Sequence, residues 1–256
     1  MNAVLSIVLT HLGGERGRPW LSWRRAVCPT EDLLVLFRGP ADQAGTLGHD
    51  PCLPVPEFRI NTRDHQRERQ SFVPIWSLVS NWIKGRSYTH VLFMEYDHLP
   101  LVPDLVDRWA GYLAGRGADV AGFAVARVDG TNNPHALYHD VDHQFTRFLE
   151  TISCRADKRV VLSMLGTGSL WTREAFDAVA AVAEPFPVYL ELWFATVAHH
   201  LGFRVVDMPP EQKRWVRSQG EFSKRIREAR EAGAWSIHPV KCPPDLALAP
   251  AAAQPR

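Results

Sequence analysis

The chain has 256 residues, of which 46% are hydrophobic, 22% are charged and 10% are aromatic. This composition supports a packed core and excludes a disordered chain, a collagen-like fibre and a coiled coil as the whole protein. The 29 lysine and arginine residues nearly balance 28 aspartate and glutamate residues, so the formal net charge is +1. Because this balance favours neither nucleic acid nor an anionic membrane, we expect no nucleic-acid partner.

In chain order, the sequence predicts a strand at 3–10, a glycine-containing loop at 11–19, a helix at 20–26, a strand at 33–37 and loops at 41–69. It then predicts a helix at 71–84, a strand at 91–94, a helix at 104–114, a strand at 119–125 and a polar segment without clear periodicity at 127–150. The last predicted elements are an apolar run at 160–164, helices at 172–183 and 190–201, a strand at 203–207 and a partly helical basic stretch at 211–232. Short apolar runs that alternate with amphipathic helices are typical of an α/β fold with a mostly parallel sheet.

The cysteines and the N-terminal apolar run bear on the cellular location. The four cysteines lie far apart and form no CxxC pair, so we expect free thiols and a cytoplasmic protein. The run Ala3–Leu9 is short and is interrupted by Ser6, and no basic region precedes it. It therefore predicts a buried strand rather than a signal peptide, and no later run is long enough to be a transmembrane segment.

Two carboxylates, Glu95 and Asp97, directly follow the predicted strand 91–94. Ligands of open α/β sheets bind outside the carboxyl ends of the strands, and alternate residues of an extended chain point to the same side. Such a pair can hold a hard divalent cation together with substrate phosphates. The alternative interpretation is that Asp97 caps the following turn and that both acids form surface ion pairs.

The segment Glu95-Tyr96-Asp97 resembles the DxD motif of the GT-A glycosyltransferases, the nucleotide-diphospho-sugar transferases, in a family-2-like form with glutamate first. Three more segments are similar to this family's motifs and follow in its order. They are the glycine-containing stretch 165–176, the stretches 189–191 and 201–205 around the family's catalytic carboxylate, and the C-terminal histidine segment 235–241. The resemblance extends over residues 3–241.

The resemblance implies a GT-A type single α/β domain over residues 1–242, with a mixed, mostly parallel central sheet and helices on both faces. A donor half would extend to about residue 100 and an acceptor half from 101 to 242, while the Pro/Ala-rich residues 243–256 are expected to form a disordered tail. The implied activity is transfer of a sugar from a nucleoside diphosphate sugar to a hydroxyl acceptor. UDP is the family's commonest donor nucleotide. The acceptor class and the oligomeric state stay open.

The family's metal site, transferred residue by residue, implies Mn²⁺ or Mg²⁺ as the cofactor. Asp97 would bind the ion directly, His238 would supply an imidazole nitrogen, and Glu95 would reach the ion or the ribose through water. The nucleotide-sugar contacts that the resemblance implies are Thr10, His11, Arg38, Glu95 and Lys241, the last as a point charge on a phosphate oxygen. Taken without the family, His238 is a single histidine before a proline in a loop.

Glu191 is the candidate general base for the acceptor hydroxyl. The family usually has an acidic pair at this position, whereas here Leu192 follows Glu191. The alternative is a carboxylate that the dipole of a helix N-terminus favours. The residues leave open whether the reaction inverts or retains the anomeric configuration.

Two other functions stay open from the sequence. One is a non-catalytic module of the same fold that binds a nucleotide or a glycan. The other is a metal-dependent hydrolase that uses the histidines and aspartates of the segment His135–His143, although consecutive residues of an irregular loop rarely converge on one ion. The loop 11–18 lacks the Gly-Lys-Ser/Thr ending of a P-loop and does not match GxGxxG, so a dinucleotide oxidoreductase is not indicated.

Overall fold

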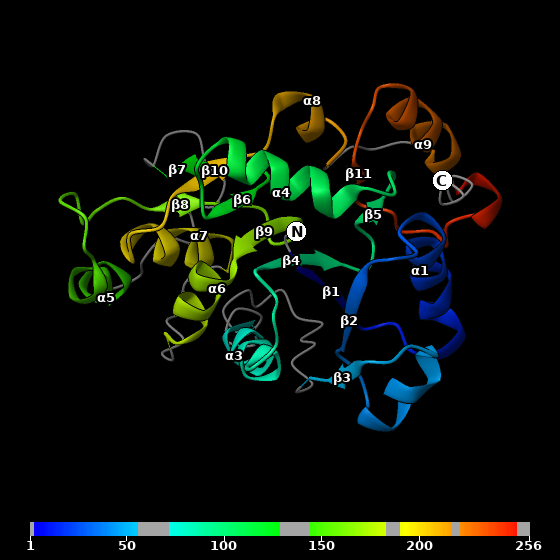
Figure 1. The fold of residues 1–256 in the computed structure, drawn as a ribbon, viewed down its shortest axis with the longest axis horizontal. Coiled ribbons are helices and arrows are strands. Elements are labelled where there is room, and N and C mark those ends of the chain that lie inside the picture. Colours follow the sequence, from blue (N-terminus) through cyan, green and yellow to red (C-terminus); the bar gives the residue numbers. More distant parts are fainter. Residues whose placement is uncertain (1–2, 56–71, 129–143, 183–189, 217–220, 250–256) are drawn as a thin grey trace.

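The computed structural model describes residues 3–55, 72–128, 144–182, 190–216 and 221–249 (Figure 1). A seven-stranded sheet with the order β10-β6-β9-β4-β1-β2-β3 forms its centre. The strands of this sheet are β1 (Val4–Thr10), β2 (Asp32–Phe37), β3 (Cys52–Pro54), β4 (His90–Glu95), β6 (Val120–Gly122), β9 (Ser169–Thr172) and β10 (Val205–Asp207). Strand β9 runs antiparallel to β4 and β6, and the other neighbouring pairs are parallel. The predicted mixed, mostly parallel sheet is confirmed.

Two small antiparallel pairs lie outside this sheet. Strand β5 (Leu99–Pro100) pairs with β11 (Ser236–Ile237), and β7 (Ala126–Arg127) pairs with β8 (Leu162–Ser163). The β5–β11 pair joins the chain just after β4 to the C-terminal part of the protein.

Helices cover both faces of the sheet. The helices are α1 (Gly14–Val27), α3 (Phe72–Ile83), α4 (Leu105–Gly115), α5 (Gln144–Ile152), α6 (Arg173–Ala180), α7 (Leu190–His200), α8 (Pro210–Lys213) and α9 (Phe222–Glu231), with the 3₁₀ helices η1 (Ala41–Leu47) and η4 (Leu246–Leu248). Figure 1 shows α4 on one side of the sheet and α3 and α6 on the other. The helices on both faces confirm the predicted fold class.

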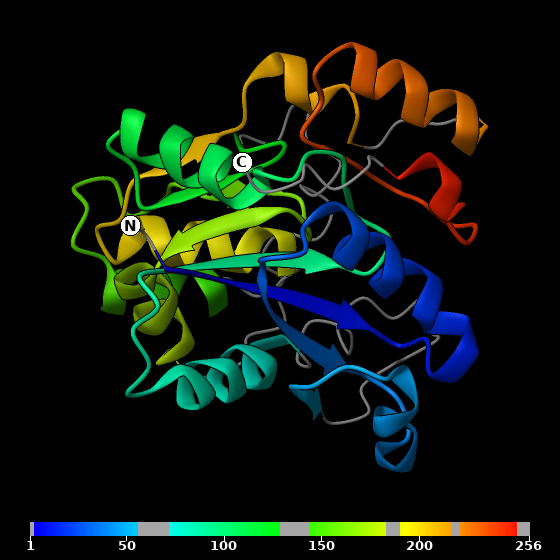
Figure 2. The same ribbon diagram turned by 45° about the vertical axis from the view of Figure 1, so that its right-hand side comes forward.

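The side chains of β4 show how the two faces are built. Val91 and Phe93 pack into the cluster with α3, α6 and α7, whereas Leu92 and Met94 pack into the cluster with α1, α4 and α9. Alternate residues of a strand point to opposite faces, so a strand buried on both faces is apolar throughout. Figure 2 shows that β4 and its parallel neighbour β1 point in the same direction.

Helix α1 begins at Gly14, earlier than the predicted start at residue 20. The glycines that indicated a loop are needed for close packing of this helix. Gly14 has φ +53°, and a Cβ on Gly17 would lie 2.2 Å from the carbonyl oxygen of Leu12 and 2.7 Å from the side chain of Leu47. The first turns of α1 therefore pack against η1 with no room for a side chain at Gly17.

Several elements were not expected from the sequence, among them β9 and α5. Strand β9 lies in the glycine-containing stretch 165–176, and its 4 residues are too few to show an alternating pattern. Helix α5 lies at the end of the segment 127–150, where the buried Phe145 and Leu149 repeat at helical spacing over only nine residues. The predicted helix boundaries elsewhere differ from the observed ones by a few residues, as is usual at frayed ends.

Residues 243–249 belong to the segment that the sequence analysis expected to be a tail. They include η4, and Nη1 of Arg230 donates a hydrogen bond of 2.6 Å to the carbonyl oxygen of Leu248. Residues 250–256 lie outside the described part. All four cysteines are free thiols, as expected. Within the described residues, no helix has the length and apolar character needed to span a bilayer.

Candidate functional site

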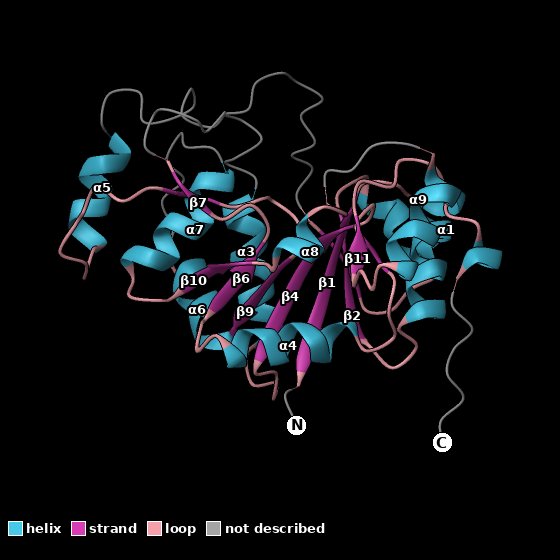
Figure 3. Cartoon of the chain, turned by 90° about the horizontal axis from the view of Figure 1, so that it is seen from above, coloured by secondary structure: helices cyan, strands magenta, loops and turns pink. Residues whose placement is uncertain are grey.

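The carboxyl ends of three parallel strands form the floor of the candidate site. Strands β1, β2 and β4 lie side by side (Figure 3), and the register pairs Leu9 with Glu95 and Thr10 with Phe37. Backbone hydrogen bonds continue past the strand ends, from the N–H of Tyr96 to the oxygen of Leu9 at 2.9 Å. The acid pair therefore lies at the strand-end edge where the sequence analysis expected it.

Glu95, Asp97 and His238 converge on one point. Each offers a ligand atom, and these atoms all lie within 4.8 Å of one another. The N–H of His98 bonds to the oxygen of Glu95 at 3.0 Å, so the two acids come together through a turn rather than through an extended chain. The pairing of β11 with β5 brings His238, which follows β11 directly, to the same turn.

Asp97 is the buried charged group of this cluster. Its side chain is 1% exposed, Lys241 donates a hydrogen bond to its Oδ2, and Nε2 of His238 lies 3.6 Å from its Oδ1. Burial raises the pKa of the Asp97 carboxyl, but the interactions with the neighbouring His238 and Lys241 lower it more, so the pKa is below its usual value. Asp97 is therefore a buried carboxylate held in its ionised form.

The cluster fits a divalent cation. Among the described residues, Oδ1 of Asp97 and Nδ1 of His238 are buried and have no hydrogen-bond partner. Buried polar atoms in folded proteins normally have partners, and an atom without one needs an explanation. Two carboxylates and one imidazole are a donor set that suits Mn²⁺, with its mixed preference for oxygen and nitrogen.

The hydroxyl groups of Thr167 and Ser236 contact His98, which directly follows Asp97 of the cluster. Oγ1 of Thr167 accepts a hydrogen bond of 2.8 Å from the N–H of Glu95 and lies 3.2 Å from Nδ1 of His98. The other ring nitrogen of His98 lies 2.9 Å from Oγ of Ser236. Burial and then the charge of His238 lower the pKa of His98 well below its usual value, so the ring is neutral. The sequence analysis did not select these three residues, although His98 directly follows Asp97.

Glu191 lies in the first turn of α7 and faces the glycine loop. Its Oε1 accepts a hydrogen bond of 3.0 Å from the N–H of Gly166, and its backbone oxygen accepts one of 2.8 Å from the N–H of Met164. The loop 165–168 therefore contacts Glu191 through Gly166 and Glu95 through Thr167. The structure thus links the candidate base to the acid pair through a single short loop.

The residues expected to contact the nucleotide occupy the ends of β1 and β2. Thr10 is 2% exposed, and its Oγ1 accepts a hydrogen bond of 3.0 Å from the N–H of Leu12. The ring of His11 packs edge-on against Tyr96, with ring centres 5.1 Å apart. Arg38 is 8% exposed, and its backbone N–H donates a hydrogen bond of 2.7 Å to the backbone oxygen of Thr10. The hydroxyl group of Thr10 thus stabilises the turn after β1, while His11 packs against Tyr96, the residue between the two acids.

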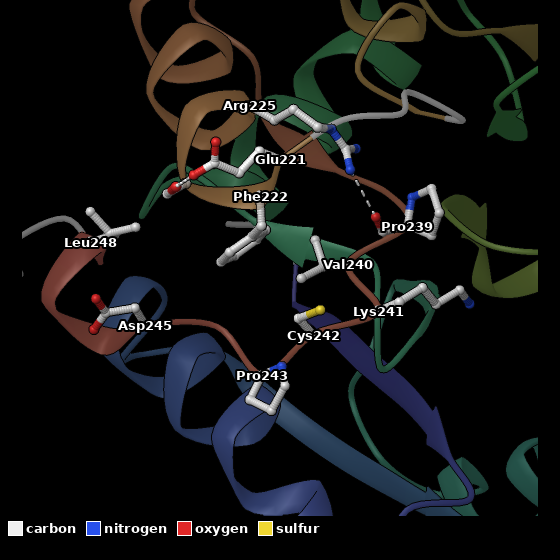
Figure 4. Close-up of a pocket in the computed structure, with 11 residues that line it drawn as sticks. Glu221, Phe222, Arg225, Pro239, Val240, Lys241, Cys242, Pro243, Asp245 and Leu248 are labelled. Carbon is white, nitrogen blue, oxygen red and sulfur yellow. Dashed lines mark hydrogen bonds between the residues drawn. The ribbon is translucent and has the colours of Figure 1, made fainter.

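A cavity of about 570 Å³ lies in the C-terminal part of the protein, and Lys241 is one of the residues that line it (Figure 4). It lies between the first turns of α9, the segment 239–243 and η4, and its wall includes Phe222, Arg225, Val240, Lys241, Cys242 and Leu248. Its volume is in the range of ligand sites. Lys241 is part of this wall, and its ammonium group donates a hydrogen bond to Asp97 of the cluster. The segment His135–His143, the basis of the hydrolase alternative, lies outside the described residues.

No protein-family model matches the chain, and no curated protein matches it. The synthetase of CMP and 2-keto-3-deoxy-manno-octonic acid, complexed with CTP, is similar in fold at 12% identity and TM-score 0.41, over 81% of this chain and 90% of that one. A mannosyltransferase from Pyrobaculum calidifontis, in complex with GDP-Man and Mn²⁺, is similar at 13% identity and TM-score 0.44, over 81% of this chain and 55% of that one. Residues 1–349 of TarS from S. aureus are similar at 11% identity and TM-score 0.40, over 81% of this chain and 58% of that one.

The chain spans a little over half of the length of the mannosyltransferase and TarS structures, at 55% and 58%. With every TM-score below 0.5, these similarities say nothing of the activity of this chain. The chemistry is therefore considered from the site residues alone.

Proposed function

We propose that this protein is a metal-dependent glycosyltransferase that moves a sugar from a nucleoside diphosphate sugar to a hydroxyl acceptor. The observation that supports it most is the cluster of Glu95, Asp97 and His238 at the strand ends, with a buried oxygen of Asp97 that has no hydrogen-bond partner among the described residues. A departing nucleoside diphosphate carries developing negative charge, and a site that holds a cation next to it lowers the barrier.

The roles of the chain's own residues follow from their positions. Asp97 and His238 would hold a Mn²⁺ or Mg²⁺ ion, with Glu95 completing the set directly or through water. When bound, the ion would supply positive charge that offsets the diphosphate. Lys241 sits at the solvent side of Asp97 and would donate to a phosphate oxygen. His11 and Arg38, at the ends of β1 and β2, would contact the nucleoside.

Glu191 would take the proton from the acceptor hydroxyl. The N–H of Gly166 donates a hydrogen bond to Oε1 of Glu191 and thereby orients its carboxylate. A positioned carboxylate that removes a proton contributes typically about 10²–10⁴-fold to a rate. The loop 165–168, which contacts both Glu191 and the backbone of Glu95, would fix the distance between acceptor and donor.

The proposal is tested by incubating the protein with UDP-, GDP-, TDP- and CDP-sugars and measuring release of the free nucleoside diphosphate. We expect release from one donor class with Mn²⁺ and none with EDTA. Asp97→Asn should lose this release, because a neutral amide binds a hard cation poorly. Asp104→Asn is the matched control, since Asp104 is half exposed and pairs with Arg108.

The outcomes separate the alternatives. Release that persists fully in Asp97→Asn or in EDTA would contradict the metal role of the cluster. Nucleotide binding that is unchanged by EDTA, without turnover of any donor, would favour the non-catalytic binding module. Activity lost on replacing His139 and His143, but kept in Asp97→Asn, would favour the hydrolase.

A further inference from the structure

We propose that His98 is a positioning residue that holds the segments carrying Glu95, Asp97 and His238 in register for the metal ion. This inference rests on the proposed function, because it concerns the same metal site. His98 does not itself belong to the cluster. It acts through two hydroxyl groups, those of Thr167 and Ser236, which come from two distant parts of the chain.

The contacts of His98 join three separate segments. The residue follows Asp97 directly, at the turn after β4. Its Nδ1 lies 3.2 Å from Oγ1 of Thr167 in the glycine loop, and its Nε2 lies 2.9 Å from Oγ of Ser236 in β11. The side chain is completely buried, at 0% exposure, so water cannot replace either contact.

Each hydroxyl group leads on to a residue of the cluster. Thr167 accepts the hydrogen bond of the backbone N–H of Glu95 at 2.8 Å, and thereby fixes the end of β4. Ser236 begins β11, and His238 directly follows this short strand. The ring of His98 also packs against the ring of His238, with centres 5.2 Å apart. One imidazole thus contacts or borders every segment that supplies a metal ligand.

The fold makes space for this ring at a specific glycine. Gly168 has φ +73°, and a Cβ there would lie 2.3 Å from Cε1 of His98. On another side, the ring of Phe123 lies 5.6 Å from that of His98. The ring is therefore confined on several sides, and among the described residues its two nitrogens contact the hydroxyl groups of Thr167 and Ser236.

The physical consequence concerns metal affinity. A metal site binds tightly when its ligands are held in place before the ion arrives, and loss of an outer partner typically weakens binding about 10–100-fold. Loss of either hydroxyl leaves a ring nitrogen of His98 buried without a partner, so the ring and the attached segment shift. The affinity for the ion should therefore fall by more than a loss of folding stability alone would cause.

The experiment measures Mn²⁺ binding directly by electron paramagnetic resonance of the free ion, on full-length variants. Thr167→Val and Ser236→Ala each remove one hydroxyl group and keep the size of the side chain nearly the same. Thr167→Ser keeps the hydroxyl group and is the conservative rescue. Thr196→Val is the matched control, because Thr196 is also completely buried and its hydroxyl bonds twice to the backbone of Leu162, at 2.9 and 3.0 Å.

We expect Thr167→Val and Ser236→Ala to weaken Mn²⁺ binding about tenfold or more, while Thr167→Ser stays near the wild type. Thr196→Val should lose stability yet keep its Mn²⁺ affinity. Mn²⁺ binding that is unchanged in both Thr167→Val and Ser236→Ala would overturn the positioning role alone. A wild-type protein that binds no Mn²⁺ would overturn the proposed function, and the positioning role with it.

Discussion

Lys241 donates a hydrogen bond to Oδ2 of Asp97 across 144 positions of the chain. The carboxylate side chain is 1% exposed, while that of the lysine is 69% exposed, so the ammonium group reaches the buried acid from the solvent side. Burial lowers the pKa of Lys241, but its hydrogen bond and charge interaction with Asp97 raise it more, so the lysine is charged. A metal ion at Asp97 must therefore share the carboxylate with a resident cation.

Lys241→Gln should change metal and nucleotide binding in opposite directions. Binding of Mn²⁺ alone should strengthen about fivefold, which corresponds to ~1 kcal/mol of lost competition from a partly exposed ion pair. Binding of the nucleoside diphosphate in the presence of Mn²⁺ should weaken, because a phosphate partner is lost. Calorimetric titrations measure both affinities. The control is Lys213→Gln, which breaks the ion pair with Asp207, and equal effects of both substitutions would contradict the assigned role.

Glu191→Gln should separate donor binding from transfer. The amide oxygen of glutamine can still accept the hydrogen bond from Gly166, so the loop and the donor site should stay intact. Transfer to the acceptor should fall about 10²–10⁴-fold, since an amide cannot take the proton. The measurement is the rate of product formation at saturating donor, with donor affinity as the internal control. Unchanged transfer would leave Glu191 with the structural role of a helix N-terminal carboxylate.

Gly168→Ala should destabilise the fold strongly. The new Cβ combines a positive φ with a 2.3 Å approach to the ring of His98, and the expected loss is about 2–4 kcal/mol in the free energy of unfolding. Gly111→Ala is the matched control. Its Cβ would meet nothing within 4 Å, and alanine should stabilise this position of α4 by up to about 1 kcal/mol. Urea denaturation measures both, and a Gly168→Ala variant as stable as the wild type would refute the tight packing described for His98.

Stability should decrease as the pH falls below about 6.5, the usual pKa of histidine in an unfolded chain. Burial lowers the pKa of His200, only partly offset by its hydrogen bond to the oxygen of Val160 at 2.7 Å. The folded state therefore protonates His200 at a lower pH than the unfolded state does. The contribution of the neutral His200 to stability is fully present above the unfolded-state pKa and is lost as the pH falls below that value.

His200→Gln tests this dependence. The free energy of unfolding of the wild type should fall more steeply between pH 7 and pH 5.5 than that of the variant, by at most about 1.4 kcal/mol per pH unit. Denaturation curves at several pH values measure the two slopes. Identical slopes would show that His200 has the same pKa in both states.

The sequence predicted the strand-end acid pair well because local patterns determine it. Residues 91–94 of β4 are all apolar, and the acids Glu95 and Asp97 that follow them must lie at the ligand-binding edge of a parallel sheet. His238 and Lys241 could be proposed only through the resemblance to a family, because no local pattern shows that β11 pairs with β5. The structure now supplies that pairing.

Other parts could not be read from the sequence for physical reasons. Strand β9 is determined by its pairing with β4 and β6 rather than by a pattern in its own residues. The contacts of His98 with Thr167 and Ser236 join residues far apart in the chain, and a buried histidine in a sequence looks like any other histidine. Glycines at 14 and 17 indicated a loop because their packing role in α1 depends on η1, which the sequence did not predict.

The central claim is that the strand-end cluster binds a divalent ion together with a nucleoside diphosphate. The most direct measurement is the thermal unfolding midpoint of the wild-type protein and Asp97→Asn with UDP, GDP, TDP or CDP, each with Mn²⁺ and with EDTA. A ligand at a hundredfold excess over its dissociation constant stabilises the folded state by roughly 2.7 kcal/mol. The account predicts a raised midpoint for the wild type with one nucleotide and Mn²⁺, abolished by EDTA and by Asp97→Asn. A wild-type midpoint that no nucleotide shifts, or a shift that EDTA leaves intact, would contradict it.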